Sequence, residues 1–136
     1  MGQRIYTYIQ SRFYRAPEII MGIPYTTAID MWSFGAIVAE LYSGFPLFPG
    51  ESEVEQLAYI MELYGAPPDD VLKLSQRKNL FFSKTNDPIL APNTRGKIRQ
   101  PGSKKISDIL KCSDLIFLDF LNQCFEWHPL KRMTPL

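Results

Sequence analysis

The spacing of apolar side chains along the chain predicts three helices of several turns each. Apolar residues occupy nearly the whole circumference of segment 28–43, as in a helix at the centre of a larger body, and Gly44 suits the position just past its end. Segments 53–64 and 114–127 carry narrower apolar stripes. Their members are Val54, Leu57, Ile60, Met61 and Tyr64 in the first and Leu115, Leu118, Leu121 and Phe125 in the second. The pattern is that of a mainly α-helical domain.

Polar residues with helix-capping character precede each of these segments. Thr27 with Asp30, and Ser52 with Glu55, have the spacing of a capping box, in which two side chains satisfy free backbone N–H groups at a helix start. Ser113 is the expected cap of the last helix. These residues predict that the helices begin directly after positions 27, 52 and 113.

The remaining segments lack helical periodicity. Residues 3–16 are expected to be extended or loop-like, and Pro17 begins a short helical turn. Segment 69–112 has scattered prolines, glycines and basic residues, so we expect an irregular insertion and not a second domain.

Composition and charge narrow the classes of function. The 136 residues are 46% hydrophobic, and 15 basic residues nearly balance 14 acidic ones. Such a chain can bury a core, and its charge gives no reason to expect a nucleic-acid partner. A local basic run could dock acidic partners, but no aromatic interleaving accompanies it, and a solvated loop is the favoured interpretation. The run comprises Arg95, Lys97, Arg99, Lys104 and Lys105.

The sequence contains no pattern of a membrane or metal site. The longest apolar stretch, 29–41, is too short for a bilayer and includes Asp30 and Glu40. No signal-peptide pattern follows Met1. The two cysteines, Cys112 and Cys124, lack metal-ligand spacing and fit a reducing compartment. The single histidine, His128, has no nearby nucleophile, and we expect a structural role for it. We therefore expect a soluble intracellular protein of the cytoplasm, the nucleus or both, with no membrane partner.

Three short motifs occur in order along the chain. Ala-Pro-Glu occupies 16–18, Asp-Met-Trp-Ser-Phe-Gly occupies 30–35, and His-Pro-Leu-Lys-Arg occupies 128–132. This order resembles the second half of a eukaryotic protein kinase, from the end of the activation segment to a late arginine. The resemblance implies the large (C-terminal) lobe of the kinase fold, mainly α and truncated at both ends.

A longer motif narrows the resemblance. Residues 6–15 read Tyr-Thr-Tyr-Ile-Gln-Ser-Arg-Phe-Tyr-Arg, which resembles the activation segment of the dual-specificity tyrosine-phosphorylation-regulated kinases (DYRKs). The run from Glu40 to Gly50 is similar to the second class of that family. The resemblance implies four parts in one partial kinase domain. They are the activation-segment end at 1–18, the central and following helices at 27–64, an insertion at 69–112 and a late helix at 113–136.

The resemblance also implies roles for residues near the N-terminus. Tyr8 matches the tyrosine that these kinases phosphorylate on themselves, and Arg12 and Arg15 match the residues that pair with its phosphate. Gln10, Ser11 and Arg12 would help form the floor that receives the substrate residue after the phosphoacceptor, often proline. By residue type alone, a loop with solvated arginines and packed tyrosines is the alternative.

Other matched residues have structural roles in the family. Glu18 and Arg132 are expected to form an ion pair that fixes the activation segment. Asp30 matches a residue that accepts bonds from the catalytic loop, so without that loop we expect a buried charge lacking partners. Trp32 and Gly35 are expected to serve packing.

The motifs of nucleotide binding and phosphoryl transfer are absent from the 136 residues. There is no Gly-rich loop, Val-Ala-Ile-Lys strand, His-Arg-Asp loop or Asp-Phe-Gly. One hypothesis is a fragment of an active kinase whose complete domain binds ATP and Mg and phosphorylates serine and threonine in protein substrates. This fragment alone would be inactive and would bind no cofactor. The other is a non-catalytic interaction module derived from the large lobe. The interaction-module hypothesis requires an isolated chain that is soluble, monomeric and cooperative in melting. We expect the opposite, because the central helix has lost neighbours and would expose an apolar patch that favours aggregation.

Overall fold

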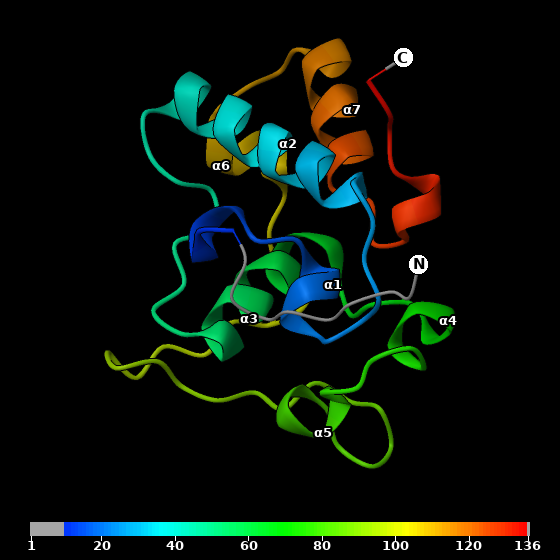
Figure 1. Ribbon diagram of the computed structural model, residues 1–136. Helices are drawn as coiled ribbons and strands as arrows, with labels where there is room; N and C mark the ends of the chain where they lie inside the picture. Colours follow the sequence, from blue (N-terminus) through cyan, green and yellow to red (C-terminus); the bar gives the residue numbers. More distant parts are fainter. Residues whose placement is uncertain (1–9, 136) are drawn as a thin grey trace.

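Helix α2 (Ala28–Ser43) is the central element of the computed structural model, which describes residues 10–135. Helices α6 and α7 pack against α2, and α1 packs against α3 below them (Figure 1). The other bounds are η1 Arg12–Tyr14, α1 Pro17–Ile20, α3 Glu53–Tyr64, α4 Asp69–Leu72, α5 Lys78–Phe81, α6 Ile106–Leu110, α7 Leu115–Cys124 and η2 Pro129–Lys131. The described part of the chain is mainly helical and contains no strand, as the sequence predicts.

An aromatic cluster holds the central helix in place. The Trp32 ring lies 6.0 Å from that of Phe48 and 5.0 Å from that of Phe125. Gly35, one turn along α2, allows α7 to approach closely, because a Cβ there would lie 2.6 Å from the Cβ of Cys124. Trp32 and Gly35 are both buried and both contribute to packing.

The helix starts differ in part from the prediction. Thr27 precedes α2 but has helical backbone angles and makes no side-chain cap, and the Thr26 hydroxyl accepts from the Ala28 N–H instead. Ser52 caps α3 as predicted by accepting from the N–H of Glu55 at 3.2 Å. The prediction for Ser113 is wrong. Asp114 caps α7, because its carboxylate reaches two backbone N–H groups.

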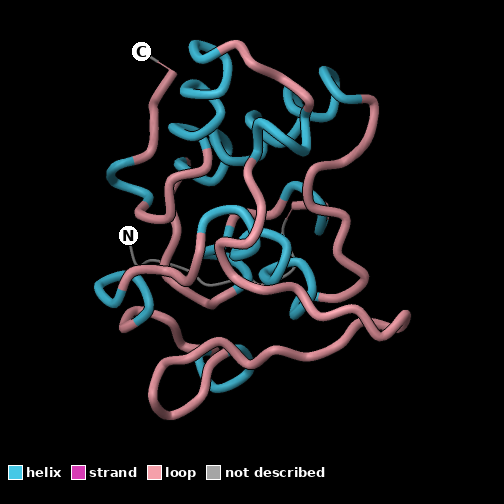
Figure 2. Tube along the Cα trace, turned by 180° about the vertical axis from the view of Figure 1, so that it is seen from behind, coloured by secondary structure: helices cyan, strands magenta, loops and turns pink. Residues whose placement is uncertain are grey.

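The insertion is loop along most of its length (Figure 2). The last part of the insertion covers the end of α3. There Gly102 N–H donates to Met61 O, and Lys104 N–H donates to Glu62 O. The bond to Glu62 O satisfies a carbonyl group that the last turn of a helix otherwise leaves free, while Met61 O also accepts from Gly65 N–H.

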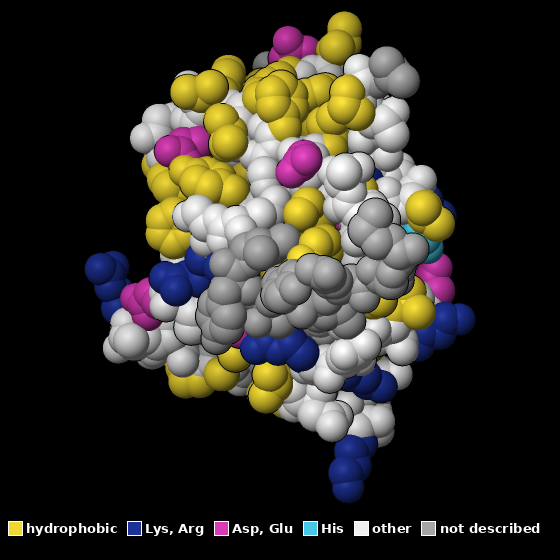
Figure 3. Space-filling view, in the orientation of Figure 1, with side chains coloured by type: hydrophobic (Ala, Val, Ile, Leu, Met, Phe, Trp, Pro, Cys, Tyr) yellow, Lys and Arg dark blue, Asp and Glu magenta, His cyan; other side chains and the backbone are white. Residues whose placement is uncertain are grey.

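One side of α2 faces solvent. Phe34 is 50% exposed and Leu41 80%, and neighbouring apolar side chains on α2 and α7 are exposed with them. Hydrophobic side chains gather over these two helices in Figure 3. The expected apolar patch on the central helix is therefore present. Among residues 10–135, no helix combines the length and the apolar character needed to cross a bilayer.

Candidate substrate-binding and activation-segment site

Residues 10–18 of the activation-segment motif run beside α2 and α3. The element η1 contacts both helices, and α1 contacts α3. Tyr8, the predicted phosphorylation site, lies outside the described residues. The described residues of the same predicted site are Gln10, Ser11, Arg12 and Arg15.

Gln10 is fixed by its side chain. The amide nitrogen donates to Ile29 O at 3.2 Å and to the Ser33 hydroxyl at 2.6 Å, and the amide oxygen accepts from Ala16 N–H at 3.0 Å. The φ of Gln10 is 67°, in the left-handed region that residues with a Cβ rarely adopt. Three hydrogen bonds to α2 and to the segment itself hold this backbone conformation in place.

Ser33 completes that attachment and was not identified from the sequence. Its hydroxyl accepts from Gln10 and donates to the carbonyl of Tyr14 at 2.7 Å. One α2 hydroxyl thus joins Gln10 to Tyr14, four residues further along the segment. Its place one residue after Trp32 in the kinase-like motif was the signal that could have found it.

Arg15 is buried and joins two groups. One terminal nitrogen, Nη2, donates to the carbonyl oxygen of Gln10 at 3.0 Å. The other, Nη1, lies 3.6 Å from Glu53 Oε1 at the start of α3. A single guanidinium group therefore bridges the left-handed turn and the following helix.

Arg12 has a different set of neighbours. Its Nε donates to Gly50 O at 2.9 Å, and Gly50 N–H donates to the side chain of Gln56 at 3.0 Å. Gly50 must lack a side chain here, because a Cβ would lie 2.5 Å from the backbone nitrogen of Gln56. Arg12 and Arg15 thus have different partners, Gly50 for Arg12 and Gln10 with Glu53 for Arg15. Ser11, which precedes Arg12, is exposed. Their pairing with a phosphate on Tyr8 stays a prediction.

Tyr14 attaches the segment to the far part of α2. Its hydroxyl donates to Glu40 Oε1 at 2.6 Å. This hydrogen bond raises the pKa of the Tyr14 phenol above its usual value, with smaller contributions from burial and from the charge of Glu40.

Glu18 on α1 and Arg132, which follows η2, form a bidentate ion pair. The distances are 2.7 Å from Nη1 to Oε2 and 3.0 Å from Nη2 to Oε1. Both side chains are almost fully buried. Arg132 also donates to Glu126 O and Ala28 O, so each of its three nitrogens has a partner. Its guanidinium lies 5.3 Å from the centre of the Trp32 ring.

Asp30 does not behave as expected. It is exposed on the first turn of α2, where solvent reaches its carboxylate, so the expectation of a costly buried charge is wrong. It lines an open crevice of about 790 Å³ whose walls include Met31, Phe34 and Met133. Water in this crevice can hydrate the Asp30 carboxylate.

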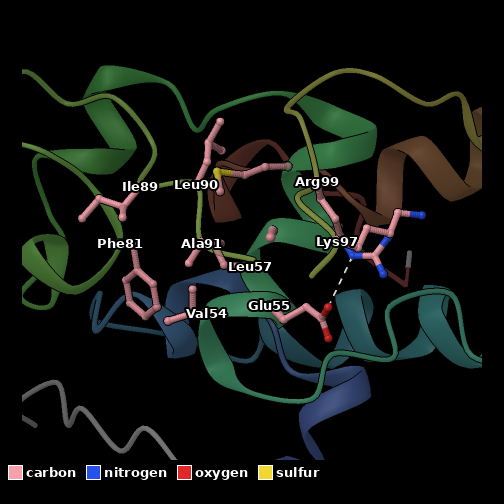
Figure 4. Close-up of a pocket in the computed structure, with 11 residues that line it drawn as sticks. Val54, Glu55, Leu57, Phe81, Ile89, Leu90, Ala91, Lys97 and Arg99 are labelled. Atoms are coloured by element: carbon pink, nitrogen blue, oxygen red, sulfur yellow. Dashed lines mark ion pairs between the residues drawn. The ribbon is translucent and has the colours of Figure 1, made fainter. Parts of the chain in front are cut away.

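The basic run is also only partly a solvated loop. Arg95, Lys97 and Lys105 are exposed, but Arg99 stacks on Tyr59 with its Cζ 3.6 Å from the ring centre. Arg99 also lies 3.6 Å from Glu55 and 3.5 Å from Glu62, and Figure 4 shows the contact with Glu55. These charges had no sequence signal, because α3 supplies the carboxylates from about 40 residues upstream.

Glu55 is ionised more readily in this setting than in water. Burial acts to raise its pKa, but the Glu51 N–H, the Asn93 amide and the charge of Arg99 outweigh burial and lower the pKa below its usual value. Beside it, Val54, Leu57, Phe81, Ile89 and Leu90 surround a cavity of about 20 Å³, space for one water molecule (Figure 4). This pocket is too small for a nucleotide or a peptide side chain of any size.

The described residues contain no group of three or more His, Cys, Asp or Glu side chains that could hold a metal ion. The arrangement is instead one of fixed backbone carbonyls, guanidinium groups and a left-handed turn.

Comparison with known proteins shows the family of the chain. Residues 2–136 match the family model described as protein kinase domain. The chain is 59% identical over 135 residues to dual specificity tyrosine-phosphorylation-regulated kinase 2 of Drosophila melanogaster, covering 99% of this chain and 19% of that protein. It is 56% identical over 133 residues to dual specificity tyrosine-phosphorylation-regulated kinase 4 of Homo sapiens, covering 98% of this chain and 26% of that protein. A third relative, the DYRK-family kinase pom1 of Schizosaccharomyces pombe, is 50% identical over 134 residues, covering 98% and 12%. The chain thus spans about a quarter or less of the length of these relatives.

Proposed function

Because the chain belongs to the protein kinase domain family and, within it, to the second class of DYRK kinases, we propose that it forms the substrate-receiving part of a dual-specificity kinase domain. The complete domain transfers the γ-phosphate of ATP to serine or threonine of protein substrates and to its own Tyr8. Nucleotide and Mg are bound elsewhere in that domain, since this sequence has no His-Arg-Asp or Asp-Phe-Gly motif. These 136 residues alone are inactive in phosphate transfer.

The bond between Arg15 and the Gln10 carbonyl carries the proposal. A substrate chain that settles on residues 10–12 brings the N–H of the residue after its phosphoacceptor toward this floor. The Gln10 carbonyl already accepts from Arg15, so that N–H loses its water without gaining a partner, an unfavourable exchange. Proline has no N–H and avoids the loss. The arrangement therefore favours serine or threonine followed by proline.

The same segment supports the self-phosphorylation part of the proposal. A phosphate on Tyr8 would bring roughly −1.5 to −2 charges close to two guanidinium groups in sequence. Arg12 and Arg15 are both held by backbone carbonyls, at Gly50 and Gln10, so little further ordering is needed for them to receive it. The buried Glu18–Arg132 pair anchors the segment to the helical base.

The compartment is part of the same proposal. An ATP-dependent kinase acts inside the cell, in the cytoplasm, the nucleus or both. The two cysteines, Cys112 and Cys124, are free and buried, which is typical of a reducing compartment.

Peptide phosphorylation by the full-length protein tests the proposal. Two peptides that differ only in Pro or Ala after the serine are compared, and we expect higher kcat/KM for the Pro peptide. Mass spectrometry of the purified protein should show phosphate on Tyr8. No phosphate transfer, or equal rates on the two peptides, would contradict the proposed substrate class.

A further inference from the structure

Glu53, the first residue of α3, lies between two arginines from distant segments. Its Oε2 is 2.6 Å from Arg77 Nη2, and its Oε1 is 3.2 Å from Arg77 Nη1. The same Oε1 lies 3.6 Å from Arg15 Nη1. All three side chains are largely shielded from solvent, so salt screens these interactions less than at an open surface.

Arg77, which is itself attached to the end of α1, fixes the position of the Glu53 carboxylate. It donates to the carbonyl of Ile20 at 2.9 Å, and its backbone N–H donates to Met21 O at 3.2 Å. Its stem packs on Gly22, where a Cβ would lie 2.8 Å from Arg77 Cγ. The insertion thus presents an arginine whose position is set by the end of α1, and that arginine orients the Glu53 carboxylate.

Arg15 responds to this carboxylate as a rigid body. Its guanidinium is planar, so the direction of one terminal nitrogen fixes that of the other. Nη1 faces Glu53 while Nη2 donates to the Gln10 carbonyl. A carboxylate at Glu53 therefore favours the one orientation of Arg15 that occupies the Gln10 oxygen.

We propose that Glu53 is a positioning residue for substrate selection, which holds Arg15 on the Gln10 carbonyl and so enforces proline after the phosphoacceptor. The inference rests on the proposed function and adds a residue from α3, and an anchor from the insertion, to the specificity device. When Glu53 loses its charge, the orientation of Arg15 that occupies the Gln10 oxygen is less strongly favoured. That oxygen can then accept the N–H of a residue other than proline.

The test is the ratio of kcat/KM for Ser-Pro and Ser-Ala peptides, measured on the full-length protein and on its Glu53→Gln variant. The ratio should fall about three- to tenfold, the range for one weakened charge-assisted hydrogen bond. The lower ratio should come in part from a higher kcat/KM for the Ser-Ala peptide. Glu53→Asp keeps the charge at shorter reach and should give an intermediate ratio, and it serves as the second variant if the Gln protein does not fold.

Glu51→Gln is the matched control, because Glu51 is exposed and bonds to Thr94, not to Arg15. Its ratio should equal that of the wild type. In an Arg15→Gln background, Glu53→Gln should leave the ratio unchanged, since Glu53 acts through Arg15. If the role of Glu53 were purely structural, the substitution would lower kcat/KM equally for both peptides, and that result would overturn the inference.

The two proposals fail in distinguishable ways. If the wild type itself does not prefer the Pro peptide, the proposed function is wrong. If the wild type prefers it and the Glu53→Gln and Glu53→Asp variants keep the full ratio, only the role of Glu53 is wrong.

Discussion

Removal of Arg132 should destabilise this fold severely. The substitution Arg132→Met keeps much of the apolar stem but deletes the partner of the Glu18 carboxylate, whose side chain is 1% exposed. A buried ion left without its partner costs about 3–5 kcal/mol. A typical domain is stable by only about 5–15 kcal/mol, so the variant should lose roughly a fifth or more of its stability.

Part of this loss of stability comes from the unpaired charge of Glu18. Adding Glu18→Gln to Arg132→Met removes the stranded charge and leaves a neutral amide, which costs about 1–3 kcal/mol when unpaired. The double variant should therefore be more stable than Arg132→Met alone. Lys131→Met is the control, because Lys131 is exposed and should change stability by no more than about 0.5 kcal/mol.

Urea unfolding followed by tryptophan fluorescence measures these differences, since Trp32 lies beside the Arg132 guanidinium. The midpoint gives the stability change provided that the slope is unchanged. Equal instability of the single and double variants would refute the reasoning, because the cost would then come from lost packing and not from an unpaired buried charge.

Two further predictions concern packing and pH. Gly35→Ala should destabilise the protein by about 1–3 kcal/mol in the same assay, because the new methyl group would overlap Cys124 where α7 crosses α2; no loss would show that the helices separate freely. The lowered pKa of Glu55 means that its contribution to stability is present above the unfolded glutamate value of about 4.3 and is lost as pH falls through the lower folded pKa. Unfolding measured from pH 6 down to pH 3 should show this acid loss, and Glu55→Gln should reduce it while Glu51→Gln should not.

Local pattern accounts for much of the fold. The spacing of apolar residues located α2, α3 and α7, because helical periodicity is a property of neighbouring residues. The ends were less accurate. Thr27 and Ser113 were assigned as side-chain caps, but capping depends on backbone angles that residue types do not fix. The prediction also extended α7 to Trp127, whereas it ends at Cys124.

In the candidate site, too, the sequence located the segment but not the partners of its side chains. The motifs around Gln10, Arg15 and Glu18 marked the segment from the sequence alone, and composition with helical periodicity gave the fold class. Only the tertiary structure decided the partners, because they come from segments far apart in the chain. It set Gln10 on Ser33, joined Arg15 to Glu53, and turned Asp30 toward solvent. Hydrogen bonds and ion pairs depend on distance in space, and that distance is fixed only when α2, α3 and the insertion have packed together.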